Sequence, residues 1–261
     1  MKLISLAPSN TEILFALGLG KDITAVTRYC DYPADAKYKH KLGGWLDVKI
    51  EELEKLKPDL ILTSNFLQSE LVERLSKKNF NVVHVDPRTL SDVYESIIII
   101  GQAVGKSEKA QGIVDEMKRR FEKIKENNKL KQKIRIYCEE WFKPPTISGN
   151  WVPELIEIAG GISFCPKGQK SFEVDADEIA KFNPRAAIMS WCGFGRRIDI
   201  SKVKSRPVWN NIAAFRNGEI FTIHDSYLNR PGPRLVEGAE KIAKILGKIR
   251  EENLKNLGKS K

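Results

Sequence analysis

The most constraining feature of this sequence is the regular alternation of short apolar runs with amphipathic segments over residues 1–90. Short runs of apolar and β-branched residues predict strands at 2–6, 23–28, 60–63 and 82–85. Helical periodicity lies between them, after Ser9 and at 50–56 and 67–77. Strands that alternate with helices in this way predict an α/β fold with a mostly parallel sheet covered by helices on both faces.

The first of these helices carries a start signal in its sequence. Ser9-Asn10-Thr11-Glu12 matches a capping box, in which a hydroxyl and a carboxylate bond the exposed backbone N–H groups of the first turn. We therefore expect Ser9 to cap this helix, and Gly18 and Gly20 to mark its end.

The middle of the chain lacks a strand signal. Residues 91–104 and 107–129 are both predicted to be helical, and a helix of about 20 residues spans about 30 Å, enough to join two lobes. The alternation then resumes, with strands expected at 134–139, 186–191 and 220–224 and helices at 153–159, 176–182, 208–215 and 233–246. We expect an N-terminal α/β lobe at 1–90, a helical linker at 91–130 and a C-terminal α/β lobe at 131–261.

Composition narrows the function classes. The formal net charge is +10, but Lys and Glu alternate through most of the chain and no nucleic-acid motif occurs, so we expect no nucleic-acid partner and a monomer. No apolar run is long enough to span a bilayer, and residues 1–6 lack the features of a signal peptide. As written, the sequence predicts a cytoplasmic protein, or an extracytoplasmic one if a leader has been removed.

In open α/β sheets, ligands bind beyond the carboxyl ends of the strands. The ligand-binding candidates are the residues at those ends and in the adjoining loops, namely Pro8, Ser9, Tyr29, Trp45, Ser64, Asn65, Phe66, Trp141, Trp191, Tyr227 and Arg230. Every Trp except Trp209 falls in a loop or at a strand end. Each could cover the rim of the core, but several on one predicted face favour a broad apolar ligand cleft.

Polar residues offer weaker alternatives. Glu139 and Glu140 are adjacent on a predicted strand and should point to opposite faces, which makes a poor acid–base pair. Cys30, Cys192 and His224 could form a soft-metal site, although small buried thiols are commoner and the four cysteines show no paired spacing. The glycine-flanked loop with Arg196 and Arg197 could hold an anion.

Several segments together resemble one family, the helical-backbone (class III) substrate-binding proteins of ABC importers, and within it the cobalamin-binding branch. The resemblance rests on Ser5-Leu6-Ala7-Pro8-Ser9-Asn10-Thr11-Glu12, Tyr29-Cys30-Asp31-Tyr32-Pro33, Gly44-Trp45, Leu56-Lys57-Pro58-Asp59-Leu60, Pro144-Pro145, Gly160-Gly161, Asn183-Pro184 and Pro233-Arg234. These segments cover nearly the whole chain in the family's order.

The resemblance implies two Rossmann-like lobes joined by one long helix, with a cobalamin or another corrinoid between the lobes and no catalytic cofactor. Tyr29 and Trp45 stand where the cobalamin branch carries aromatic ligand contacts, whereas Ser64 replaces an expected aromatic residue. An ABC transporter permease is the implied partner, with Glu70 as the docking acid of the first lobe. The matching position of the second lobe, near Asn210 and Asn211, has no acid.

Two other functions remain open at this stage. A ferric siderophore or haem is the first, because Arg28, Arg196, Arg197 and Arg230 would suit an anionic chelate. The second is a cytoplasmic enzyme or metal-handling protein on the same scaffold, since a fold does not determine a function.

Overall fold

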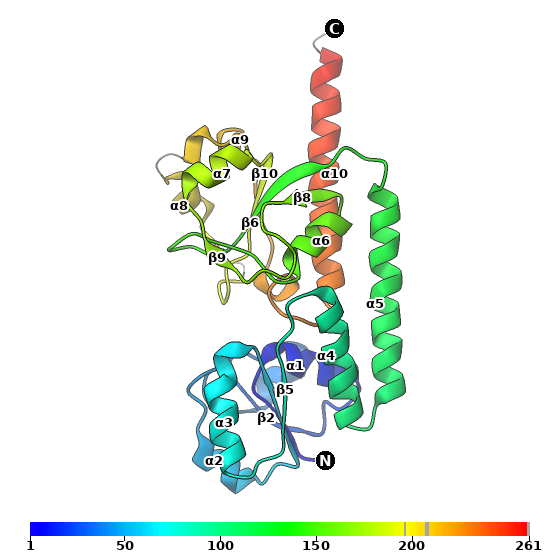
Figure 1. Cartoon of the computed structure of the whole chain (residues 1–261), viewed down its shortest axis with the longest axis vertical. Coiled ribbons are helices and arrows are strands. Elements are labelled where there is room, and N and C mark those ends of the chain that lie inside the picture. Colours follow the sequence, from blue (N-terminus) through cyan, green and yellow to red (C-terminus); the bar gives the residue numbers. More distant parts are fainter. Residues whose placement is uncertain (196, 207–208, 260–261) are drawn as a thin grey trace. The chain divides into compact units, whose positions relative to one another are not determined.

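The computed structural model describes residues 1–195, 197–206 and 209–259, and the chain forms two compact units. Unit one comprises Met1–Glu116 with Pro231–Pro233, and unit two comprises Met117–Arg230 with Arg234–Lys261. The boundary falls inside helix α5 (Ser107–Asn128), so this long helix belongs to both units (Figure 1). The α/β class with mostly parallel sheets, joined by a long helix, agrees with the sequence prediction.

Unit one contains a five-stranded parallel sheet in the order β3-β2-β1-β4-β5. Its strands are β1 (Leu3–Ser5), β2 (Ile23–Val26), β3 (His40–Lys41), β4 (Leu60–Ser64) and β5 (Val82–Val85). The central strands β1 and β4 are buried along their whole length, as expected for a parallel sheet with both faces covered. Ile4 pairs with Ile61, and Ser64 pairs with Val85.

Helices cover this sheet. They are α1 (Pro8–Ala16), α2 (Ile50–Leu56), α3 (Ser69–Lys77) and α4 (Leu90–Ala103), with short 3-10 helices η1 (Ala34–Tyr38) and η2 (Phe66–Gln68). Leu53 of α2 and Leu75 of α3 pack against Ile4 and Ile61 of the sheet. Helices α1 and α4 contact each other and lie on the other side of the strands in Figure 1.

The capping box predicted at Ser9 is wrong. Helix α1 begins at Pro8, its N-cap is Ala7, and no side chain caps it. Proline suits the first helical position because its ring already holds a helical φ and it has no N–H to satisfy. The Thr11 hydroxyl turns back to Ala7 O (3.1 Å) and Ser5 Oγ (2.8 Å).

Unit two contains a mixed sheet in the order β11-β10-β6-β7-β9, with β8 also pairing with β6. Its strands are β6 (Ile134–Trp141), β7 (Thr146–Ile147), β8 (Gly161–Ser163), β9 (Phe172–Glu173), β10 (Ala186–Met189) and β11 (Ile220–Thr222). Strands β6, β8, β10 and β11 are parallel, and β7 is antiparallel to both β6 and β9.

The helices of unit two are α6 (Val152–Ile158), α7 (Ala176–Phe182), α8 (Ile200–Lys204), η3 (Trp209–Asn211), α9 (Ala213–Arg216), η4 (Asp225–Tyr227) and α10 (Leu235–Lys259). One helix was predicted at 208–215. Residue 208 lies outside the described residues, and the rest forms two short helices, η3 and α9, separated at Ile212. The last helix runs well past the predicted end at 246, because Ile249 still packs in the core.

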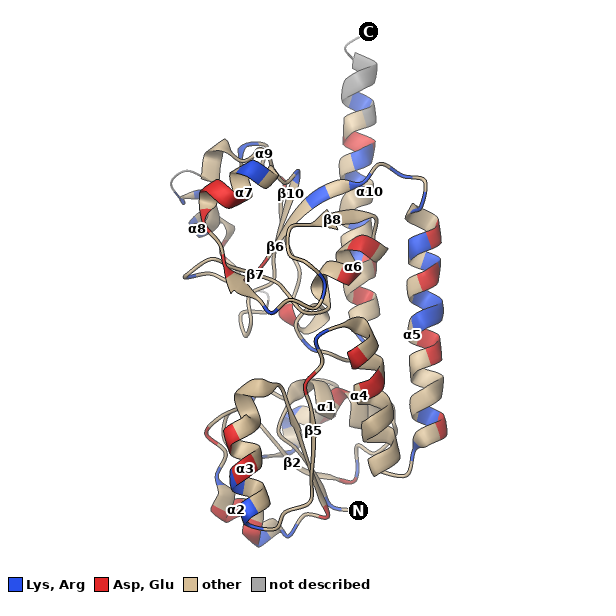
Figure 2. Cartoon of the chain, viewed as in Figure 1, with Lys and Arg blue, Asp and Glu red and all other residues tan. Residues whose placement is uncertain are grey.

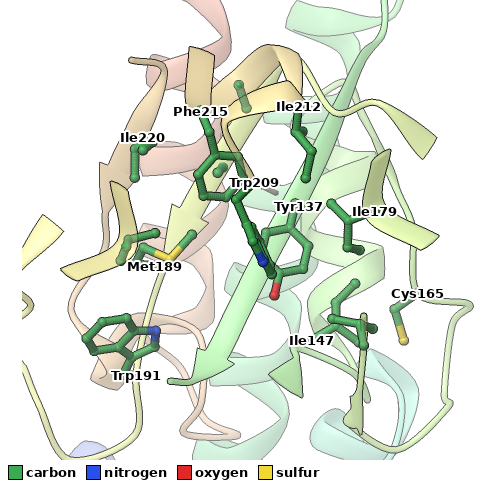
Figure 3. Close-up of a cluster of buried hydrophobic side chains, with 14 residues drawn as sticks. Tyr137, Ile147, Cys165, Ile179, Met189, Trp191, Trp209, Ile212, Phe215 and Ile220 are labelled. Carbon is green, nitrogen blue, oxygen red and sulfur yellow. The ribbon is translucent and has the colours of Figure 1, made fainter. Parts of the chain in front are cut away.

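The core of unit two is a cluster of apolar side chains that includes Tyr137, Met189, Trp191, Trp209 and Phe215 (Figure 3). The rings of Tyr137 and Trp209 meet edge to face at 5.3 Å between centroids. Among the described residues, none of the helices combines the length and the apolar character needed to cross a bilayer. Figure 2 shows basic and acidic residues interleaved along α5.

Candidate ligand-binding site

Exposed apolar side chains gather in the loops that follow the strands of unit one. We define the unit-one edge as residues 6–10, 27–33, 42–49, 65–68 and 86–89, which follow β1, β2, β3, β4 and β5. The large apolar residues exposed there are Tyr29, Tyr32, Leu46, Phe66 and Leu67. Because the strands are parallel, their carboxyl ends all lie at the same end of the sheet. Such a group of exposed large apolar residues is typical of a binding surface.

A fully buried glutamine joins three loops of the unit-one edge. The Ser64 N–H donates to Gln68 Oε1 at 2.8 Å, and Gln68 Nε2 donates to Leu6 O (3.0 Å) and Trp45 O (2.8 Å). The side chain of Gln68 is completely shielded from solvent. It therefore fixes the loop of Trp45 relative to the ends of β1 and β4. Sequence reasoning missed this residue, since no local pattern distinguishes it from a surface glutamine.

The backbone at Asn65 directs the next residue outward. Asn65 has a φ of 76° and a ψ of 144°, which lie outside the left-handed helical region in a conformation that residues other than glycine rarely adopt. Its side-chain oxygen accepts the N–H of Leu67, and its own N–H donates to Val85 O at 2.9 Å. This turn leaves the ring of Phe66 42% exposed.

Two polar atoms of the unit-one edge are buried without a partner among the described residues. They are the indole N–H of Trp45 and Oδ1 of Asn10, whose Nδ2 donates to Thr63 O at 3.0 Å. A buried polar group without a hydrogen bond costs about 1–3 kcal/mol. A ligand atom or an ordered water molecule at these atoms would offset that cost.

Two arginines of this edge each lie over an aromatic ring and pair with a carboxylate. Arg28 lies over Tyr29 and pairs with Asp47. Arg88 lies over Phe66, 4.9 Å from the ring centroid, and pairs with Asp86.

Unit two presents a second aromatic group. We define the unit-two edge as residues 141–145, 190–199 and 223–230, which follow the parallel strands β6, β10 and β11; Arg196 in this range lies outside the described residues. Trp141 is 44% exposed and meets Phe194 edge to face at 6.1 Å, and Phe194 in turn meets Trp191 at 5.5 Å. Phe142 lies against Trp191 at 4.8 Å.

A buried ion pair contacts two members of this aromatic group, Trp191 and Phe142. Arg206 donates to both oxygens of the fully buried Glu139, at 2.7 and 2.9 Å, and its guanidinium lies over Phe142. The Trp191 indole N–H and the Tyr137 hydroxyl also donate to Glu139, at 2.8 and 2.6 Å. Four donors thus satisfy this carboxylate, which fixes Trp191 and Phe142 in place.

Asp225 holds the glycine loop of the unit-two edge. The backbone N–H groups of Gly193 and Gly195 donate to its two carboxylate oxygens at 3.2 and 3.1 Å. His224 packs so closely on Gly195 that a Cβ there would lie 2.9 Å from its Nε2. This contact, together with the positive φ of 57°, favours glycine at position 195.

Comparison with known proteins assigns the family. The family model described as periplasmic binding protein matches residues 3–227, which is most of the chain. The chain belongs to the periplasmic binding protein family. This result confirms the resemblance to the substrate-binding proteins of ABC importers.

Individual relatives of this periplasmic binding protein differ in what their names say they bind. An uncharacterised ABC transporter substrate-binding lipoprotein of Bacillus subtilis (strain 168) is 30% identical, over 94% of this chain and 79% of that protein. A vitamin B12-binding protein of Vibrio campbellii (strain ATCC BAA-1116) is 26% identical, over 96% of this chain and 91% of that protein. The structure of a possible iron-binding (periplasmic solute-binding) protein from Staphylococcus epidermidis ATCC 12228 is 31% identical and superimposes with a TM-score of 0.79, over 94% and 97% of the two chains.

The structure of this periplasmic binding protein exposes some predicted ligand contacts and buries others. Tyr29, Phe66 and Trp141 are exposed. The half-buried candidates are Pro8, Trp45, Asn65, Tyr227 and Arg230. Ser9 and Ser64 are buried, at 4% and 3% exposure.

Trp191 was predicted to be a ligand contact because of its position at a strand end. It is 2% exposed and belongs to the core of unit two. The reason is its bond to the buried Glu139 and its cover by Phe142 and Phe194, neither of which the strand pattern reveals. Tyr227 lies beneath two cations of the same unit, Arg234 and Lys241.

The soft-metal alternative finds no support in the described part of the chain, where no group of three or more His, Cys, Asp or Glu side chains is placed to hold a metal ion. Cys30 belongs to unit one, is buried, and lies 3.1 and 3.3 Å from the hydroxyls of Thr11 and Thr27. Burial raises the pKa of its thiol. In unit two, Cys192 is exposed and its sulfur takes a hydrogen bond from Asn229.

The remaining polar candidates are Glu139, Glu140, Arg197, Glu70, Asn210 and Asn211. Glu139 is bound by Arg206, and burial raises the pKa of Glu140 to about 7. Arg197 donates to the carbonyl of Gly193 at 3.0 Å. Glu70 is exposed in the first turn of α3, and Asn210 and Asn211 are exposed in η3.

Proposed function

We propose that this protein is the substrate-binding component of an ABC importer and that its ligand is cobalamin or another corrinoid. The main support is the presence of exposed aromatic side chains at the carboxyl-end edges of both units, with Tyr29 and Phe66 in unit one and Trp141 in unit two. A macrocycle with broad apolar faces matches such side chains, because burial of apolar surface drives its binding. The named function of the Vibrio campbellii relative supports the same ligand.

Charge at the unit-one edge favours a corrinoid over an anionic chelate. Haem carries propionates and many ferric siderophores are anionic, so each is best held by arginines that are open to pairing. Arg28 and Arg88 are instead paired with Asp47 and Asp86. A corrinoid bears neutral amide groups around its ring and does not need a surplus of positive charge.

The proposal assigns the protein binding without a catalytic step. Glu139 is occupied by four donors and is shielded from solvent. Burial raises the pKa of Cys138 to about 12 and that of Cys165 to about 11, so both remain protonated and weakly nucleophilic near neutral pH. These features argue against a catalytic role for Glu139, Cys138 and Cys165.

The proposal extends to location and partner. We place the protein outside the cytoplasmic membrane, where it acts as a monomer that docks to a permease through Glu70 of α3; the Bacillus subtilis relative is named a lipoprotein. Fractionation of cells that express the natural gene tests the location. Recovery of the protein in the cytoplasm would contradict it.

A parallel titration tests the ligand. Cyanocobalamin, ferric haem and a ferric catecholate siderophore are added separately to the protein, and tryptophan fluorescence reports binding. We expect a Kd for cyanocobalamin in the micromolar range or tighter, weakened by Tyr29→Ala and Phe66→Ala. Tyr38→Ala is the matched control, because Tyr38 is 88% exposed on η1. Tighter binding of either iron chelate than of cyanocobalamin would contradict the ligand assignment.

A further inference from the structure

The Arg28–Asp47 pair sits in a loop shaped to hold it. The guanidinium of Arg28 pairs with Asp47 and lies over the ring of Tyr29, 5.9 Å from its centroid. The Arg28 backbone N–H donates to Gly43 O at 2.8 Å, which ties the residue to the loop that carries Asp47. A Cβ at Gly44 would collide with the Asp47 carboxylate and lie 3.1 Å from Arg28 Nη2. The pair thus occupies space that glycine leaves open.

Asp86 makes a second pair of the same kind with more contacts. Its Oδ2 accepts from Arg88 Nη2 at 2.7 Å, and its Oδ1 accepts the backbone N–H of Phe66 at 3.1 Å. The Arg88 guanidinium lies over the Phe66 ring. Asp86 therefore holds the backbone of Phe66 and, through Arg88, the ring of the same residue. Arg88 and Asp86 are 22% and 32% exposed, which makes this pair less exposed than the first.

Each pair has the same electrostatic effect on its ring. An arginine over an exposed aromatic ring would attract anions to that ring if it stood alone, because its N–H fork matches carboxylates and phosphates. A carboxylate bound to the arginine cancels most of this attraction and repels an incoming anion. The protein as a whole carries a net charge of +10, yet the arginines beside these two rings are locally neutralised.

We propose that Asp47 and Asp86 are specificity residues, which exclude anionic ligands from the rings of Tyr29 and Phe66 by occupying Arg28 and Arg88. This proposal rests on the ligand site proposed above. It deepens that proposal, because it states the ligand class as one without net negative charge at these rings. Asp47 and Asp86 act through the arginines and are positioning residues.

The experiment removes the negative charge and keeps the shape. Asp47→Asn, Asp86→Asn and the double variant are titrated with ferric haem and with cyanocobalamin at low and high ionic strength. At Asp86, asparagine retains an oxygen that can accept the Phe66 N–H, so the loop is preserved. We expect haem to bind about 3-fold tighter to Asp47→Asn and about 10-fold tighter to Asp86→Asn at low ionic strength, with the gain shrinking as salt screens the charges. Cyanocobalamin affinity should change less than about 2-fold, a range that fits the small energies of exposed pairs.

Control variants distinguish a change of charge at the unit-one edge from a change of charge elsewhere on the protein. Asp22→Asn makes the same charge change just before β2, where Asp22 lies 3.3 Å from the N-terminal amine, and should leave haem affinity unchanged. Asp86→Glu retains the charge and should not gain haem affinity. Loosening of the loop alone would not increase haem affinity. A gain in haem affinity therefore indicates that the loss of negative charge is the cause.

Two results would overturn the proposal: unchanged haem affinity in both asparagine variants, or an equal gain in Asp22→Asn. Failure of the corrinoid function has a different signature. In that case the unmodified protein does not bind cyanocobalamin, while the change in haem affinity on removal of the aspartates can still be read. The two failures are therefore distinguishable.

Discussion

The edges of the two units hold their aromatic residues in different ways. At the unit-one edge, arginine–aspartate pairs lie beside exposed rings, and Asp47 is 67% exposed. In unit two, a shielded Glu139–Arg206 pair contacts Trp191 and Phe142 of the unit-two edge. On the proposal above, charge in unit one adjusts which ligand is accepted, whereas the shielded charge in unit two is expected to maintain the fold. Removal of the charged pair in unit one and removal of the charged pair in unit two should therefore change the free energy of unfolding by very different amounts.

Loss of charge at Glu139 is expected to have the largest effect. Glu139→Gln leaves the shielded guanidinium of Arg206 without its counter-charge, and breaking a buried pair in this way costs about 3–5 kcal/mol. Urea unfolding followed by circular dichroism measures the loss. The double variant Glu139→Gln with Arg206→Met should recover part of it, because no unpaired charge remains. A loss below about 1 kcal/mol would remove the distinction between the two edges.

Gln68→Ala tests whether hydrogen bonds between uncharged groups stabilise unit one. The substitution removes three hydrogen bonds and leaves the backbone groups of Leu6, Ser64 and Trp45 without that partner. We expect a loss of about 2–3 kcal/mol in unfolding free energy. Gln111→Ala is the control, since Gln111 is exposed on α5 and bonds only one residue in the described structure, Asp115. Equal losses in the two variants would show that Gln68 has no special role.

Glu140 should give the stability of unit two a pH dependence. Burial raises its pKa from 4.5 to about 7, so the folded state favours the protonated carboxyl. The resulting stabilisation is complete below about pH 4.5 and is lost as the pH rises through about 7, with a size of about 3 kcal/mol. Glu140→Gln should flatten this part of the stability profile, and Glu173→Gln, an exposed control on β9, should not. An unchanged profile in Glu140→Gln would contradict the assignment.

Asp47→Asn should have the smallest effect on stability. Exposed ion pairs contribute about 0–1 kcal/mol, and both partners here are more than half exposed. We expect a change below about 0.5 kcal/mol in urea unfolding, equal to that of Asp22→Asn. A loss as large as that of Glu139→Gln would mean that the unit-one pair is structural.

Much of the fold could be predicted from the sequence. The helices Ile50–Leu56 and Ala176–Phe182 were predicted at their observed ends, because each has a clear apolar period and a proline shortly after its last residue. The strand Val82–Val85 was also predicted at its observed ends. Two-residue strands such as Thr146–Ile147 were missed, since so short a segment shows no periodicity and forms only through its partners β6 and β9.

The site was less predictable than the fold. Reasoning from the predicted strand ends identified Tyr29, Phe66 and Trp141, which are exposed, because it needs only the order of strands and loops. It missed Gln68 and Asp86, whose roles depend on neighbours 20 or more residues away. It could not show that Trp191 is buried in the core, because a core position at a strand end has the same local sequence as an exposed one. The expected cleft between the lobes stays a prediction.

On the same proposal, the glycine at position 44 makes the position of the Asp47 carboxylate easy to alter by mutation. Alanine there would meet the flexible end of the Asp47 side chain rather than the backbone, so the carboxylate would swing aside at little cost to folding. Arg28 would then be released without any mutation in a residue that touches a ligand. If Asp47 excludes anions as proposed, one added methyl group at position 44 would shift the ligand preference toward anionic ligands.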